Sequence, residues 1–209
     1  EPIHIVFVEE PEAHLHAQAQ QVFVRKAFEA LCNNELIKEH PWLNTQLVLS
    51  THSNHIVNEL DLNCMRYFRR VIGDSKIPIS KVVNLSSTFG KDEEETKQFV
   101  TRYIRLTHCD IFFSDAVILV EGPAEKILVP NFLTKAGLDS YYISVIEING
   151  RHAHSFRKLI EKIGIPTLII TDIDAAETKI AKDGKKHLSS VITSTGKGYK
   201  TSNLSIKKY

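Results

Sequence analysis

The chain has few cysteines, no long hydrophobic run and no basic start of the kind that opens a signal peptide. Its 209 residues include Cys32, Cys64 and Cys109, which lie far apart and form no CxxC pair. This spacing favours reduced thiols in a cytosolic protein over a disulfide scaffold or a zinc site. No run of about 18 apolar residues occurs, so we expect a cytoplasmic protein without a membrane span. Because the sequence opens inside a hydrophobic strand, we expect the chain to begin within a larger protein.

A strong net charge is also lacking, but the charge is unevenly distributed. The formal net charge is +1, which by itself does not indicate a nucleic-acid partner. Residues 175–209 hold eight lysines against two acids, a net +6, which leaves −5 for residues 1–174. This basic end predicts either a contact with a phosphate backbone or a solvated flexible segment, and charge alone leaves both open.

Apolar periodicity predicts two α/β units joined by a connector. In the first unit we expect strands at residues 3–8 and 46–50, a helix over 12–33 and a short helix over 56–60. In the connector we expect strands at 65–71 and 81–85 and a helix over 93–106. In the second unit we expect strands at 116–120, 142–148 and 166–171 and helices over 124–136 and 153–163. Alternating apolar strands and helices are typical of an α/β fold with ligands at the strand ends.

Two carboxylates and a histidine follow the two strands of the first unit. The stretch IHIVFVEEPEAHLH places Glu9 and Glu10 after one strand, and LVLSTHS places His52 after the next. Since parallel strands end at one sheet edge, we expect Glu10 and His52 in one cleft. A carboxylate beside a Mg-nucleotide can position water, and a histidine can sense the γ-phosphate. Alternatively, the two acids only cap the following helix.

This combination resembles the Walker B, D-loop and H-loop segments of ABC-type ATPases, in the branch that includes the SMC and OLD proteins. The resemblance implies that Glu9 supports Mg²⁺, that Glu10 is the catalytic carboxylate and that His52 is the switch histidine for ATP. It also implies a homodimer or higher homo-oligomer through the ATPase part, with residues 12–18 near the interface. The chain has no GxxxxGK[ST] phosphate loop, so we expect this chain alone to bind ATP weakly and to hydrolyse it poorly.

Four acids occur at the strand ends of the second unit. AVILVEGPAEK places Glu121 at a strand end and Glu125 in the first helical turn, and TLIITDID places Asp172 and Asp174 at another strand end. Residues i and i+2 of an extended segment share a face, so we expect the four acids to converge. Oxygen ligands suit Mg²⁺ or Mn²⁺, and such a cluster can hold one or two ions for phosphodiester cleavage. Taken singly, each pair could be a helix-start acid or a surface turn.

The second unit resembles the Toprim fold of topoisomerases, primases and OLD-family nucleases, whose signature is an apolar strand, EG and a later DxD. The second acid in EGPAEK is of the OLD type. The resemblance implies a Rossmann-like parallel sheet flanked by helices. It also implies that Glu121 and Glu125 are metal ligands or general base and that Asp172 and Asp174 are metal ligands, with two ions bound.

Further segments of the second unit also look OLD-like. Residues 140–166 resemble the family, which puts Glu147, Asn149 and Gly150 near the site, and TSN at residues 201–203 resembles a segment just past the DxD loop. Family members carry a further catalytic lysine, for which Lys197 or Lys200 could stand in.

Together the resemblances divide the chain into an ABC-type ATPase part (1–60), a connector (61–114) and a Toprim nuclease domain (115–209) expected to be truncated at its C-terminal end. They imply a metal-dependent DNA endonuclease regulated by ATP and active in defence against phage, in some families with a helicase-like or reverse-transcriptase partner. One alternative is an ATP-sensing assembly platform with an inactive Toprim domain. Another is a topoisomerase- or primase-type enzyme, although none of the tyrosines lies in a recognisable nucleophile domain.

Overall fold

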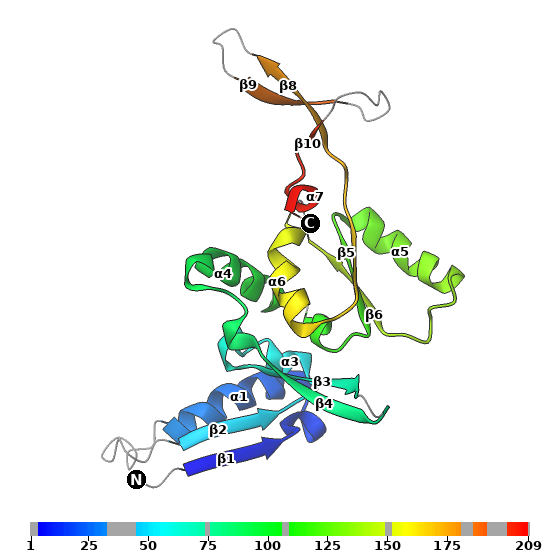
Figure 1. The fold of residues 1–209 in the computed structure, drawn as a ribbon. Coiled ribbons are helices and arrows are strands. Elements are labelled where there is room, and N and C mark those ends of the chain that lie inside the picture. The colour runs from blue at the N-terminus through cyan, green and yellow to red at the C-terminus, as the bar shows by residue number, and fades with distance from the viewer. Residues whose placement is uncertain are drawn as a thin grey trace.

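The chain forms small β-sheets, and helices lie beside the two parallel ones (Figure 1). The structure, a computed structural model, describes residues 4–32, 45–73, 76–105, 109–148, 152–180, 186–191 and 200–208. The strands of this part are β1 (His4–Glu9), β2 (Thr45–Ser50), β3 (Arg66–Ile72), β4 (Pro78–Asn84), β5 (Ala116–Val120), β6 (Ile143–Glu147), β7 (Thr167–Ile170), β8 (Ala175–Ile180), β9 (Lys186–Ser190) and β10 (Lys200–Thr201). The α-helices are α1 (Ala17–Cys32), α3 (Asn54–Val57), α4 (Glu94–Tyr103), α5 (Pro123–Lys135), α6 (Ala153–Ile163) and α7 (Leu204–Lys208).

The strands form four sheets in the described part of the chain. Two are parallel, β1–β2 and β6–β5–β7, and correspond to the two predicted α/β units. The other two, β3–β4 and β10–β8–β9, are antiparallel. The α/β class is confirmed, and the parallel sheet β6–β5–β7 with its flanking helices has the Rossmann-like arrangement expected.

The helix predicted over residues 12–33 is shorter than expected at its start. Residues Pro11–His14 instead form a 3-10 turn, and Leu15 is extended, with φ −113° and ψ 137°. An extended residue interrupts the helical hydrogen-bond ladder, so α1 begins only at Ala17. The segment between β1 and α1 is therefore a separate turn at the sheet edge, and His14 and His16 are exposed there.

The connector shares a hydrophobic core with the second parallel sheet. Strands were expected in the connector, and β3 and β4 form an antiparallel pair there, with Tyr67 opposite Val83. Val83 and Leu85 belong to the same buried cluster as Phe156 of α6. Helix α4 also lies against α6. Apolar packing is therefore continuous across residue 114. The division of the chain at residues 60 and 114 stays a prediction.

Strand β5 is the central strand of its sheet and is buried on both faces. Val117 and Leu119 belong to the large core that includes α6, whereas Ile118 and Val120 belong to a smaller cluster that includes α5. Successive side chains point to opposite faces of a strand, so the uninterrupted apolar run AVILV fills both layers. This placement fixes the end of β5, and with it Glu121, at the carboxyl edge of the sheet.

Beyond Asp174 the chain forms elements that the sequence patterns did not predict. Strands β8 and β9 pair as an antiparallel hairpin that extends away from the parallel sheet, and β10 returns to pair with β8 (Figure 1). Helix α7 then lies against α6. Across the described ranges, no helix has both the length and the apolar character needed to cross a membrane.

Candidate functional site

The first candidate site lies where β1 and β2 end. Glu9 is in register with Ser50, and the backbone N–H of Glu10 donates to the carbonyl of Ser50 at 3.0 Å. Glu10 has a left-handed backbone, φ 41°, and its Oε1 lies 3.2 Å from Nε2 of His52. Their side chains are 49% and 80% exposed. The structure thus brings Glu10 and His52 together at one strand edge, as the sequence predicted, and leaves both accessible to a ligand.

Glu12 ties this edge together, although no sequence pattern singled it out. Its Oε1 accepts hydrogen bonds from the Thr51 hydroxyl at 2.8 Å and from the backbone N–H of His52 at 2.6 Å. Burial acts to raise the pKa of Glu12, but the backbone N–H groups of Glu12 and His52, the Thr51 hydroxyl and the nearby His52 ring hold it below its ordinary value. Glu12 therefore fixes the backbone from which the His52 side chain projects.

The second candidate site lies at the carboxyl edge of β6–β5–β7. Glu121, just after β5, accepts hydrogen bonds at Oε2 from the Thr171 hydroxyl at 2.5 Å and from the backbone N–H of Asp172 at 3.0 Å. Glu121 is half-buried and Asp172 is exposed. The ends of β5 and β7 are thus joined directly through the first of the four predicted acids.

Glu125 is directed toward its own helix rather than toward the DxD segment. Its Oε2 accepts from the backbone N–H of Gly122 at 3.2 Å, which caps the start of α5. Glu147, at the end of β6, lies 3.8 Å from Nζ of Lys126. Lys200 of β10 is exposed. Lys197, Asn149 and Gly150 lie outside the described residues.

The DxD loop, residues 172–174, is held by Asn203 from the segment that resembled a family motif. Asn203 is fully buried, and its Nδ2 donates to Thr171 Oγ1 at 2.7 Å, to the Asp172 carbonyl at 2.8 Å and to Asp174 Oδ2 at 3.3 Å. Asp174 has a left-handed backbone, φ 47°. Asp172 and Asp174 therefore lie on a loop whose conformation is held by the side chain of Asn203.

The donor set of this edge suits a divalent cation, although the side chains are not gathered around one point. Carboxylate oxygens are the ligands that Mg²⁺ and Mn²⁺ prefer. Among the residues the structure describes, no three His, Cys, Asp or Glu side chains are close enough to hold a metal ion. Glu121 and Asp172 are neighbours, whereas the expected convergence of all four acids is not seen, because Glu125 caps α5 and Asp174 accepts from Asn203.

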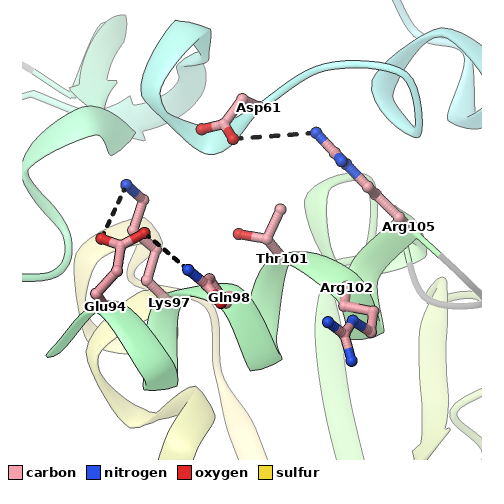
Figure 2. A pocket seen from close by; sticks show the side chains of 7 residues that line it. All are labelled: Asp61, Glu94, Lys97, Gln98, Thr101, Arg102 and Arg105. Atoms are coloured by element: carbon pink, nitrogen blue, oxygen red, sulfur yellow. Dashed lines mark hydrogen bonds and ion pairs between the residues drawn. The ribbon is translucent and has the colours of Figure 1, made fainter.

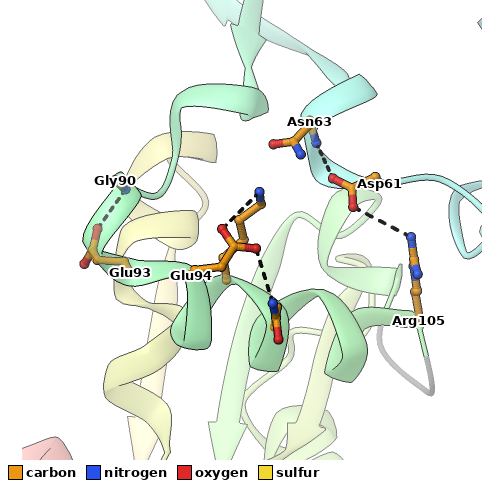
Figure 3. A network of polar contacts seen from close by, with 8 residues as sticks. Asp61, Asn63, Gly90, Glu93, Glu94 and Arg105 are labelled. Atoms are coloured by element: carbon orange, nitrogen blue, oxygen red, sulfur yellow. Dashed lines mark hydrogen bonds and ion pairs between the residues drawn. The ribbon is translucent and has the colours of Figure 1, made fainter.

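A pocket of about 430 Å³ lies elsewhere, between α4 and the segment that carries Asp61 (Figure 2). Its lining residues are Asp61, Glu94, Lys97, Gln98, Thr101, Arg102 and Arg105. Lys97 lies 3.6 Å from Glu94, and Arg105 lies 4.0 Å from Asp61, so these charges largely neutralise one another (Figure 3). None of the predicted site residues lines this pocket.

Two segments of the chain match known family models. Residues 112–174 match the TOPRIM domain of overcoming lysogenization defect (OLD) protein-like proteins. This segment of the chain is therefore similar to an OLD-like Toprim domain. Residues 1–57 match the AAA ATPase domain. The Toprim match spans Glu121, Glu125 and the DxD loop, and the ATPase match spans Glu9, Glu10 and His52, so both candidate sites lie inside recognised family segments.

Two curated proteins resemble nearly the whole chain. Both are named Endonuclease GajA and come from Bacillus cereus. The protein of strain HuB5-5 is 34% identical over 218 residues, which cover 99% of this chain and 31% of that protein. The protein of strain VD045 is 25% identical over 185 residues, which cover 87% of this chain and 28% of that protein. The chain therefore spans about a third of the length of these relatives.

Proposed function

We propose that the full-length protein is a metal-dependent DNA endonuclease whose acid site is formed by Glu121, Glu125, Asp172 and Asp174. The observation that carries this proposal is the direct link between Glu121 and the backbone of Asp172 at the ends of adjacent parallel strands of an OLD-like Toprim domain. The endonuclease name of both relatives supports the same activity, with DNA as the substrate.

In this proposal, the acids hold one or two Mg²⁺ or Mn²⁺ ions. Bound there, such ions would activate water and stabilise the leaving oxygen of a phosphodiester. Asp172 is exposed and can turn toward a ligand. Glu121 uses only Oε2 for its contacts with described residues, which leaves Oε1 for an ion. Glu125 would join the site by releasing the N–H of Gly122, a bond of 3.2 Å.

The ATPase part regulates the nuclease in this proposal. Glu9 would support Mg²⁺, Glu10 would orient water and His52 would sense the γ-phosphate of ATP. The 3.2 Å contact between Glu10 and His52 supports a shared role. We further propose homo-oligomerisation through the ATPase part, a cytoplasmic location and a role in defence against phage. An additional helicase-like or reverse-transcriptase partner belongs to the same proposal.

The nuclease activity is tested by incubating the full-length protein with supercoiled plasmid and Mn²⁺ or Mg²⁺. We expect nicked or linear products that depend on the ion. Glu121→Gln and Asp172→Asn should each reduce the rate at least a hundredfold, because each removes a charged oxygen ligand. Asp139→Asn, a carboxylate on the loop after α5, is the matched control and should cut normally. Full activity in both site variants would refute the assignment.

A second candidate function is an ATP-sensing assembly platform in which the Toprim domain does not cut. It is favoured by the capping role of Glu125 and by the lack of a three-acid group among the described side chains. A full-length protein that folds, binds ATP and oligomerises, yet neither binds Mn²⁺ nor cuts DNA, would establish this function instead.

A further inference from the structure

We infer that Asn203 is a positioning residue for the acid site and that it acts on Glu121 through the hydroxyl of Thr171. This role rests on the proposed function, because it concerns the same acids. Its structural part, the fixing of the loop at residues 172–174, can be measured without any metal.

The side-chain amide of Asn203 can have only one orientation. On one side its Oδ1 accepts from the backbone N–H groups of Ser205 at 2.8 Å and Ile206 at 3.4 Å, which begins α7. On the other side its Nδ2 faces a hydroxyl oxygen, a carbonyl and a carboxylate. Backbone N–H groups only donate and carbonyls only accept, so exchanging oxygen and nitrogen would break contacts on both sides.

This orientation determines where the proton of the Thr171 hydroxyl goes. Because the Asn203 amide nitrogen can only donate, Thr171 Oγ1 must accept at that contact. Its own single proton is then directed to Glu121 Oε2, 2.5 Å away. Asn203, Thr171 and Glu121 thus form a directed chain of hydrogen bonds in which the Glu121 carboxylate accepts.

The same segment fixes the backbone of the DxD loop. The Thr201 hydroxyl donates to the carbonyl of Ile173, and the backbone N–H of Ser202 donates to the carbonyl of Asp174 at 2.8 Å. Asp174 needs this support, because its left-handed backbone is unfavourable for a residue other than glycine. Residues 201–203 therefore determine both the conformation of the loop and the direction of Glu121.

Thr171→Val is the main test, because valine has nearly the shape of threonine but neither donates to Glu121 nor accepts from Asn203. In the full-length protein we expect about tenfold weaker Mn²⁺ binding by calorimetry and a matching rise in the Mn²⁺ concentration needed for nicking. The rate at saturating Mn²⁺ should change much less. Thr171→Ser keeps the hydroxyl and should restore both values. Thr134→Val, which removes an exposed hydroxyl bond in α5, is the matched control.

Asn203→Asp separates positioning from simple packing. It keeps the size of the side chain and the oxygen that caps α7, but replaces the donor with a carboxylate that faces three acceptors. In the metal-free protein we expect hydrogen exchange at the amides of Asp172 and Ser202 to accelerate at least tenfold, with Val117 in the core of β5 unchanged.

The outcomes distinguish this inference from the proposed function. If wild-type protein neither binds Mn²⁺ nor cuts DNA, the proposed function falls, while accelerated exchange in Asn203→Asp still supports the fixing of the loop. If exchange is unchanged, or if Thr171→Val binds Mn²⁺ as wild type does in a protein that cuts, the positioning role is overturned.

Discussion

The carboxylate of Glu12 accepts a hydrogen bond of 2.6 Å from the backbone N–H of His52, a residue 40 positions away in the sequence. The bond connects the turn after β1 with the end of β2. It therefore joins the two segments that carry Glu10 and His52, and its strength should depend on the charge of Glu12.

Glu12 should make stability depend on pH. Its pKa is lowered in the folded chain, so the stabilisation is present above the ordinary glutamate pKa and is lost as the pH falls through the folded value. Glu12→Gln should therefore lower the thermal midpoint at pH 7, and the difference from wild type should shrink at pH 3–4. Thermal unfolding at both pH values measures this. Glu29→Gln, an exposed residue of α1, is the control. An equal difference at both pH values would contradict the assigned cause.

The Asp172→Asn/Asp174→Asn double variant should not bind Mn²⁺ in a calorimetric titration that gives a binding signal with wild type. Asparagine tolerates the left-handed backbone of Asp174, so the loop should keep its shape while losing two charges. Asp139→Asn/Glu161→Gln removes two exposed charges elsewhere and should bind normally. Absence of binding in correctly folded wild-type chain would favour the platform function.

Gly164 and Gly137 form a matched pair for backbone strain. Both have left-handed backbones, with φ 68° and 71°, so an alanine should destabilise the fold by about 1–2 kcal/mol at either position. A Cβ at Gly164 would also collide with the guanidinium of Arg69, which donates to the carbonyl of Ile163 at 3.3 Å, whereas a Cβ at Gly137 meets nothing within 4 Å. In urea unfolding, Gly164→Ala should be more destabilising by about 0.5–1.5 kcal/mol, the value of one hydrogen bond. Equal losses would show that Arg69 moves without cost.

Cys109 and Cys64 should differ in reactivity. Burial, with a smaller contribution from Asp110, raises the pKa of Cys109 to about 12, whereas Cys64 is exposed. Because the thiolate is the reactive form, iodoacetamide at pH 8 should modify Cys64 rapidly and leave Cys109 unmodified until the chain unfolds. Peptide mass spectrometry distinguishes the two sites. Rapid modification of native Cys109 would show that the contact between its thiol and Asn58 Oδ1 opens readily.

Sequence patterns predicted the parallel sheets well, because their strands are short, largely apolar runs. The run at β5 had the predicted bounds, and so did helix α6. The predicted start of α1 was wrong, because apolar periodicity cannot detect the extended residue Leu15 that separates the turn from the helix. The hairpin β8–β9 was missed because its side chains follow no clear apolar alternation.

For the candidate sites, the sequence identified the acids but not their partners. Glu10 and His52 were placed together because parallel strands end at one edge. Glu125 was expected beside Asp172, but the same residue type three positions after Gly122 is also the capping residue that a helix start favours. The role of Asn203 depends on a contact across 32 residues with Thr171, and no local pattern encodes such a contact.

Because β10 pairs with β8, the geometry of the acids does not depend on the length of the hairpin. The chain leaves the DxD loop through β8 and returns through β10. Ala175 of β8 pairs with Thr201 of β10, directly beside the loop. The segment of chain between these paired residues therefore has both ends fixed. A change in its length alters mainly the loop-closure entropy, which varies slowly with length. The length and the sequence of this segment can therefore change without rebuilding the site from which it departs.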